Sequence, residues 1–190
     1  MRLRVTPQPS PQNWTCHFHG IQLPDSILSG KDFILYAVKY VNPWHGFYLR
    51  RGKDVIEGKN GNTSLNQTLV RHKQFVESDE VIKASTQSLS KVELPVVYKD
   101  KDGNNIHVNL ILTFDEQGNC SVSSNSPAYT ASGTGKFVKK GEKKSWGNVD
   151  RDALYLNYRV DLSDMAVTST DTLVLRNRGV AMETFSPVAK

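Results

Sequence analysis

Apolar and polar residues alternate with a period of two along much of this chain. The clearest run covers residues 106–114, and a second covers residues 92–98, where Pro95 removes one backbone donor and indicates an edge or bulged strand. The apolar positions of the first run are Ile106, Val108, Leu110, Leu112 and Phe114. Because a period of two places every second side chain on the same face of a strand, both runs predict strands with one buried face.

The last forty residues carry the same pattern. Residues 154–162 alternate between apolar and polar, and a second extended run begins at Thr172 and ends at Ser186-Pro187. The polar stretch Thr168 to Asp171 lies between the two runs. We therefore expect Thr168 to Asp171 to form the turn that joins two antiparallel strands.

Turn-forming residues separate the other runs. Asp102-Gly103 lies between the runs at 92–98 and 106–114 and predicts a hairpin, and residues 115–119 predict the next turn. Residues 54–80 fit neither the strand nor the helix period, so we expect a long polar loop and weak strands there. Strands that recur about every ten residues, without a helical pattern, predict an all-β barrel or sandwich.

The first 42 residues differ from the rest. Pro7, Pro9 and Pro11 restrict the backbone and remove hydrogen-bond donors, which predicts an extended lead. Residues 15–23 and 32–41 predict two strands, and Asn42-Pro43 interrupts the second. We therefore divide the chain into a lead with a short β appendage at residues 1–42 and a barrel domain at residues 43–190.

Composition limits the classes of function. The 24 Lys and Arg exceed the 19 Asp and Glu by five in a chain of 190 residues, and no aromatic-basic motif accompanies this mild charge, so no nucleic-acid partner is expected. No run approaches 18 consecutive apolar residues, and the first residues lack the apolar segment of a signal peptide. Cys16 and Cys120 are far apart in sequence, which favours unpaired thiols over a disulfide scaffold.

Segments that resemble known metal, phosphate or catalytic motifs lack residues that those motifs require. The stretch that begins at Asp100 resembles a calcium loop, but its twelfth position is Ile111, where an acid is required. Gly133-Thr134-Gly135-Lys136 lacks the upstream glycine and the following hydroxyl residue of a phosphate loop. His17 and His19 lack a third ligand, and no carboxylate pair can be chosen from spacing. We therefore expect no metal, no cofactor and no catalytic residue.

Four residues are the candidates for ligand contact: Trp146, Trp44, Tyr48 and Arg176. Trp146 lies in a polar hairpin tip, where it either contacts a ligand or folds back to cover the barrel end. Trp44 is expected to plug one end of the barrel. In a closed meander the first and last strands pair, so we expect an arginine of the last strand to stack on Trp44, in preference to anion binding.

Several of these segments resemble the C-terminal domain of a Bacteroidales family of exported lipoproteins. The resemblance spans residues 32–187 and is carried by residues 36–42, His45–Gly52, Val92–Gly103 and Asp171–Val180. It implies an immunoglobulin-like sandwich followed by a calycin-like (lipocalin-type) antiparallel barrel, in proteins encoded among polysaccharide-utilisation genes. It implies a cell-envelope location, and it supplies no catalytic or binding residues.

This chain departs from the family pattern at its beginning. From the resemblance we expect the signal peptide, the lipidated cysteine and most of the sandwich to be missing, and residues 14–41 to correspond to the last two sandwich strands. Membrane association is therefore expected only through a lipid anchor that this chain lacks.

The sequence and the resemblance together lead to an expected function. We expect a non-catalytic binding or accessory module of an envelope lipoprotein, which holds a glycan or an outer-membrane protein partner at the barrel mouth or through loop aromatics. A structural spacer in an outer-membrane complex is the alternative. A glycoside hydrolase is the third, and it requires two carboxylates about 5 to 9.5 Å apart in one pocket. All three depend on a closed barrel in which the strand of Tyr48 pairs with the strand of Leu175.

Overall fold

The computed structural model describes residues 40–180. These belong to the compact unit Val41–Lys190, apart from Tyr40, which ends the preceding unit. The strand predicted at 15–23 lies outside the described residues, as does the strand predicted at 32–41 except for Tyr40 and Val41, which are not in a strand. The domain boundary at residue 42 therefore stays a prediction.

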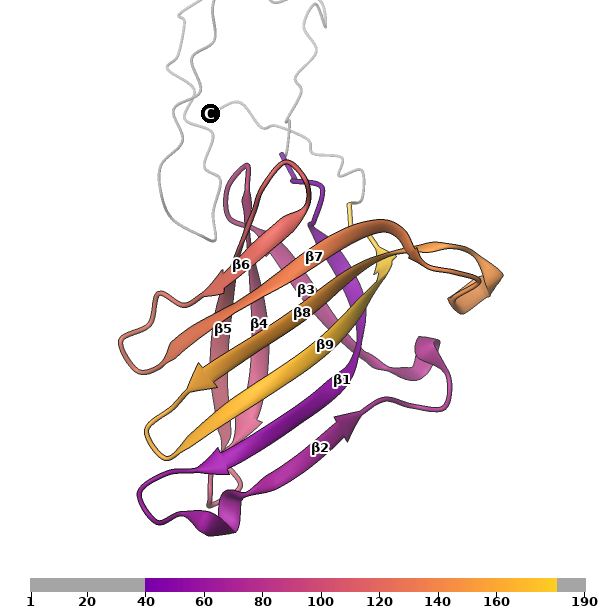
Figure 1. Cartoon of the computed structure of the whole chain (residues 1–190). Helices are drawn as coiled ribbons and strands as arrows, with labels where there is room; N and C mark the ends of the chain where they lie inside the picture. The colour runs from indigo at the N-terminus through magenta and orange to yellow at the C-terminus, as the bar shows by residue number, and fades with distance from the viewer. Residues whose placement is uncertain (1–39, 181–190) are drawn as a thin grey trace, which may run out of the picture. The chain divides into compact units, whose positions relative to one another are not determined.

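The described residues form nine strands and three short 3₁₀ turns (Figure 1). The strands are β1 (Gly46–Gly58), β2 (Gln67–Arg71), β3 (Glu80–Thr86), β4 (Lys91–Lys99), β5 (Asn105–Phe114), β6 (Asn119–Ser123), β7 (Thr130–Glu142), β8 (Arg151–Asp161) and β9 (Met165–Asn177). The 3₁₀ turns are η2 (Thr63–Leu65), η3 (Val76–Ser78) and η4 (Trp146–Asn148). The residues between 40 and 180 contain no α-helix, which confirms the all-β prediction.

The sheet closes into an eight-stranded antiparallel barrel. Strands β3 to β9 pair in chain order, and β1 pairs with both β3 and β9, while β2 adds a ninth strand along the edge of β1. Tyr48 and Leu175 are direct partners in the β1–β9 ladder. The expected pairing of the first and last strands is confirmed.

The turn predicted at Thr168 to Asp171 is wrong. These residues lie inside β9, where Thr168 pairs with Arg159 and Asp171 pairs with Leu156. The hairpin turns at residues 162–164 and is closed by the Leu162 N–H, which donates to the Met165 carbonyl at 2.9 Å. The reason is that Ser169 and Asp171 are polar residues with partners inside the barrel, so their polarity does not indicate solvent.

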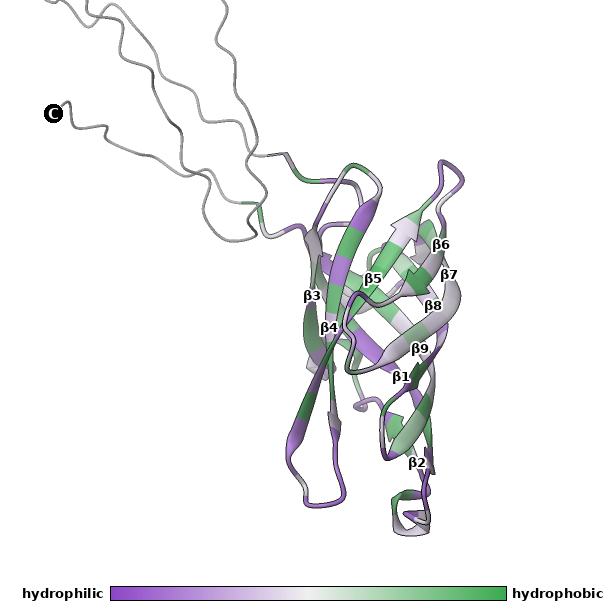
Figure 2. Ribbon diagram, turned by 90° about the vertical axis from the view of Figure 1, so that its left-hand side faces the viewer, coloured by the Kyte–Doolittle hydropathy of each residue, from purple (hydrophilic) through white to green (hydrophobic). Residues whose placement is uncertain are grey.

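Apolar side chains fill most of the interior. Their alternation along the strands appears as green and purple bands, seen clearly on β4 in Figure 2. Leu94, Leu110 and Leu154 are fully buried, and burial of such side chains contributes about 1.5–3 kcal/mol each. The Trp44 ring packs against this core, stacked on Phe114 with ring centroids 4.2 Å apart.

Strand β1 changes its partner halfway along one edge. Its residues Gly46–Arg50 pair with β3, whereas Gly52–Ile56 pair with β2. Strand β3 meets β4 at only two register positions, those of Ser85 and Thr86. The segment 54–80, expected to be a loop with weak strands, therefore contains the end of β1, the turns η2 and η3, and the short strand β2, and it ends where β3 begins.

Candidate functional site

A layer of polar side chains crosses the barrel interior at the level where β1 changes partner. Arg50 and Asp54 project from β1, and Ser169 and Asp171 project from β9, because residues two apart on a strand share a face. Their exposed fractions are 3% for each β1 residue, 0% for Ser169 and 1% for Asp171. Strands β2, β4 and β8 add Arg71, Tyr98 and Tyr158.

Asp171 is the centre of this network. Its Oδ2 accepts from Arg50 Nε at 2.9 Å and from the Tyr158 hydroxyl at 2.9 Å, and its Oδ1 accepts from Arg71 Nη2. Arg71 Nη1 forms an ion pair with Asp54, which also accepts from the Ser169 hydroxyl. The positive charges of two arginines thus balance the negative charges of two aspartates in this network.

The burial of this network affects the pKa values of its members. Burial lowers the pKa of Arg50, but its electrostatic interactions with Tyr158 and Asp171 outweigh this effect, so the net shift is upward and the guanidinium stays charged. Burial also raises the pKa of Tyr158, which keeps the phenol protonated as a donor. Buried ion pairs cost desolvation and add little net stability, so such a cluster is a candidate for a functional role.

Gly52 makes room for the network. A Cβ atom at position 52 would lie 2.2 Å from both the Thr170 carbonyl oxygen and Asp171 Oδ1. Glycine inside a strand often marks a close approach by another backbone. Here it allows the Asp171 side chain to lie directly against β1.

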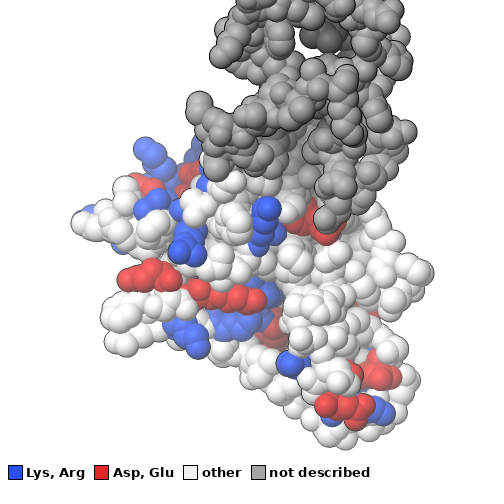
Figure 3. Space-filling model, turned by 180° about the vertical axis from the view of Figure 1, so that it is seen from behind, with Lys and Arg blue, Asp and Glu red and all other residues white. Residues whose placement is uncertain are grey.

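The polar layer reaches the surface through a pocket at the partner change of β1. The pocket has a volume of about 250 Å³ and is lined by Arg50, Val70, Arg71, His72, Lys73, Asp79 and Glu80. We call it the β2–β3 mouth. Seen from behind the view of Figure 1, the surface carries Lys and Arg side chains next to Asp and Glu side chains (Figure 3).

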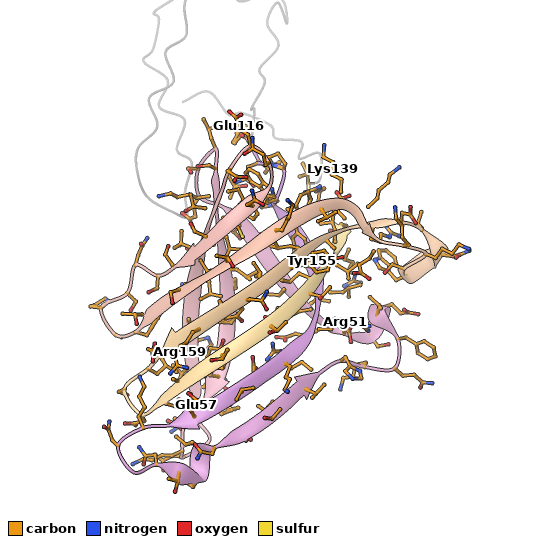
Figure 4. The ribbon with its side chains drawn as sticks, viewed as in Figure 1. Arg51, Glu57, Glu116, Lys139, Tyr155 and Arg159 are labelled. Carbon is orange, nitrogen blue, oxygen red and sulfur yellow. The ribbon has the colours of Figure 1, made fainter. Side chains whose placement is uncertain are left out.

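One ion pair and one backbone hydrogen bond hold the segment between β2 and β3 beside the mouth. Asp79 is buried and accepts from Arg51 Nε at 2.6 Å and from the Lys73 backbone N–H at 2.6 Å. Arg51 lies beside this segment in Figure 4. Arg51 Nη2 and Arg71 Nε are buried N–H groups for which the residues 40–180 provide no hydrogen-bond acceptor.

The residues chosen from sequence lie elsewhere. Tyr48 is fully buried and donates its hydroxyl to the Trp44 carbonyl at 2.8 Å, and burial raises its pKa well above the usual value. Trp44 plugs the barrel end by stacking on Phe114, in place of the expected arginine. Arg176 is exposed, and it is Arg178 that lies 6.0 Å from a ring, that of Phe137.

Trp146 folds back towards the barrel end, the second of its two expected arrangements. Its Nε1 donates to the Leu175 carbonyl at 3.4 Å, and the Arg151 guanidinium lies 3.7 Å from the ring centroid. Tyr48 and Trp146 therefore both lie near Leu175. Tyr48 is buried in the barrel core, and Trp146 lies at the barrel end. As ligand contacts all four residues stay predictions, and none of them lines the β2–β3 mouth.

The part of the chain that the structure describes gives little support for a metal site, a reactive thiol or a membrane-spanning helix. No three His, Cys, Asp or Glu residues between 40 and 180 come together as metal ligands. Burial raises the pKa of the Cys120 thiol to about 12, so it stays protonated. No helix in the described residues is long and apolar enough to cross a membrane.

The fold and the site define a closed antiparallel β-barrel with a charged layer inside and a pocket beside it. The model of a domain of unknown function, DUF5627, matches residues 43–179, and the chain belongs to this family. No curated protein matches the chain.

A solved relative supports the same fold. A protein of unknown function from Bacteroides ovatus, known from its crystal structure, shares 47% sequence identity with this chain, and the two structures match with a TM-score of 0.73. The similarity covers 78% of this chain and 46% of the solved one. This chain therefore corresponds to less than half of that relative.

Proposed function

We propose that this barrel is a non-catalytic binding module and that the β2–β3 mouth is its ligand site. The observation that carries the proposal is the juxtaposition of a pocket with the buried charges of Arg50, Arg71 and Asp171. Convergent polar groups next to a concave surface are the usual features of a ligand site. The β-barrel supplies a rigid support for them.

The state of the interior carboxylates supports binding over catalysis. Asp54 and Asp171 are both engaged by Arg71, and Asp171 is engaged by Arg50 as well. A glycosidase needs one carboxyl group that gives up a proton and one that faces the substrate. Carboxylates held in buried ion pairs serve neither role.

A sugar fits the chemistry of the mouth. Arginine supplies only donors and carboxylates supply only acceptors, so a lining that holds both can bind vicinal hydroxyl groups, which are both. The volume of about 250 Å³ is just below the roughly 300–1,000 Å³ of pockets for drug-sized ligands, which favours one ring or one chain end.

The wider setting is part of the same proposal. The resemblance to exported lipoproteins of polysaccharide-utilisation systems supports an envelope protein with a role in glycan capture, and the solved relative also comes from a Bacteroides species. In that setting the barrel is the C-terminal accessory module of a longer, lipid-anchored protein. The assignment of the barrel as calycin-like belongs to this proposal too.

A protein-interaction or spacer role is the second candidate. It is favoured by exposed apolar side chains on and near β2 and β3, of which Val70 is 62% exposed, Phe75 57% and Val81 43%. Isolated exposed apolar residues are common on protein surfaces. The mouth, with its convergent charges, is the more specific feature.

Filling the mouth with Val70→Trp tests the proposal. Val70 lines the pocket and is mostly exposed, so the larger indole side chain obstructs the pocket and leaves the core unchanged. We expect titration calorimetry with a panel of neutral and acidic saccharides to show binding to the native barrel and at least roughly tenfold weaker binding to the variant, about 1.4 kcal/mol.

The matched control is Val97→Trp. Val97 is 45% exposed on β4 and does not line the pocket, so this variant should bind as the native barrel does. Equal affinity of the Val70→Trp barrel and the native barrel, or no saccharide binding by the native barrel, would contradict the proposed function.

A further inference from the structure

The arginines at the mouth have more donors than the described acceptors engage. Arg71 uses its two terminal nitrogens on Asp54 and Asp171, and its Nε has no hydrogen-bond partner in the described part of the chain. Arg51 lies beside the mouth and is not among its lining residues; it uses Nε on Asp79, and its Nη2 is likewise without a hydrogen-bond partner there. Buried donors of charged groups left without an acceptor are unfavourable.

Arg50 also has an N–H donor that is only weakly engaged, on the side that faces the mouth. Its Nε and Nη2 are bound by Asp171 and Tyr158 at 2.9–3.0 Å. Its Nη1 has a longer ion pair with Glu80 Oε2 at 3.6 Å, beyond the normal hydrogen-bond range.

Glu80 differs from the other carboxylates of the mouth. Its side chain is 55% exposed, whereas that of Arg50 is 2% exposed. Strand pairing places Glu80 directly beside Arg50, as its partner in the β1–β3 ladder. A solvated carboxylate in a long ion pair is weakly held, so another carboxylate can displace it at little cost.

Apart from the exposed Glu80, the acceptors of the mouth are already in use. Asp79 is occupied by Arg51 and the Lys73 backbone, and the two interior aspartates are occupied by arginines. Lys73 is among the lining residues of the mouth and is a further cationic residue there. A group that only accepts hydrogen bonds therefore complements this lining better than a hydroxyl or an amine does.

We infer that the β2–β3 mouth recognises a carboxylate on its ligand, and that the Glu80 side chain holds that position at Arg50 in the free protein. This inference rests on the proposed function and names the class of saccharide, which is an acidic sugar. When the ligand carboxylate enters, it forms charge-assisted hydrogen bonds with Arg50, and Glu80 turns to solvent. The exposed side chain of Glu80 has room to do so.

Two saccharides that differ in one group test the class of ligand. Methyl glucuronide and methyl glucoside differ only in the carboxylate at C6. Titration calorimetry should show at least roughly tenfold tighter binding of the glucuronide, about 1.4 kcal/mol, and this preference should decline as salt screens the charges. Equal or tighter binding of the glucoside overturns the inference and leaves the proposed function standing. Binding of no saccharide at all removes both.

Glu80→Gln tests the role of the side chain. Removing the competing charge should tighten glucuronide binding roughly two- to fivefold, the equivalent of one exposed ion pair. Glucoside binding should not tighten, because the glucoside has no carboxylate that could take the place of Glu80. Weaker glucuronide binding would overturn the inference, because it would show that Glu80 supports the ligand.

Glu57→Gln is the matched control for net charge. Glu57 is an exposed residue of the same barrel whose carboxylate pairs with Arg159, away from the mouth lining (Figure 4). It should leave glucuronide affinity unchanged. An equal gain in the two variants would indicate a general charge effect and overturn the role given to Glu80.

Discussion

Asp171→Ala is expected to lower the free energy of unfolding by about 3–5 kcal/mol, the cost of leaving a buried charge without its partner. The Arg50 side chain is 2% exposed and contacts Asp171 Oδ2 through both Nε and Nη2. The substitution therefore leaves a charged guanidinium without this partner inside the barrel. The substitution also removes one of the two carboxylates that hold Arg71. Chemical denaturation followed by tryptophan fluorescence measures the change.

An exposed ion pair provides the control for Asp171→Ala. Glu57 and Arg159 pair at 3.1 Å with side chains 62% and 41% exposed. Glu57→Ala should therefore cost no more than about 1 kcal/mol. If Asp171→Ala cost as little as Glu57→Ala, the buried network would not have the energetic weight that we give it.

Gly52→Ala is the second substitution with a large expected effect. The added methyl group would lie 2.2 Å from the Thr170 carbonyl oxygen, which belongs to the ladder between β1 and β9. Neither strand can retreat without breaking the closure of the barrel. We expect a loss of about 3 kcal/mol or more, measured as a lower midpoint in thermal and chemical unfolding.

Gly103→Ala separates this clash from the general cost of replacing a glycine. Gly103 has a φ of +83° in the β4–β5 turn, and nothing lies within 4 Å of its added Cβ. It should cost only the roughly 1–2 kcal/mol of a left-handed backbone. A Gly52→Ala protein as stable as the Gly103→Ala protein would contradict the close approach of Asp171 to β1.

The alternation of apolar residues predicted most of the barrel. The runs ending at Phe114 and Leu162 correspond to β5 and β8, and the Asp-Gly turn joins β4 to β5 as expected. This succeeded because the interior is apolar over most of its height, so the pattern follows the strand period directly. The pairing of Tyr48 with Leu175 follows from closing a meander of this kind.

The pattern failed where the interior is polar. Ser169 and Asp171 lie on the buried face of β9, yet they look like turn residues in the sequence. Their partners come from β1, and Arg50 and Asp171 are 121 positions apart. A single sequence carries no signal for such a pairing, because each residue looks like an ordinary surface charge.

One local signal did point to the site. Gly52 follows two arginines inside a strand, and a glycine there indicates that another chain segment approaches closely. The aromatic residues were the weaker guide, because Tyr48 and Trp44 belong to the packing of the barrel end. Their size and apolar surface suit a core as well as a ligand.

The most direct test of the account is the position at which a ligand binds. Backbone amide shifts of the labelled barrel can be followed by nuclear magnetic resonance during titration with the tightest-binding saccharide of the calorimetric panel. The account predicts the largest shifts at Arg50, Arg71, Lys73 and Glu80, around the β2–β3 mouth. The largest shifts near Trp146 and Arg176, with the mouth unchanged, would contradict it.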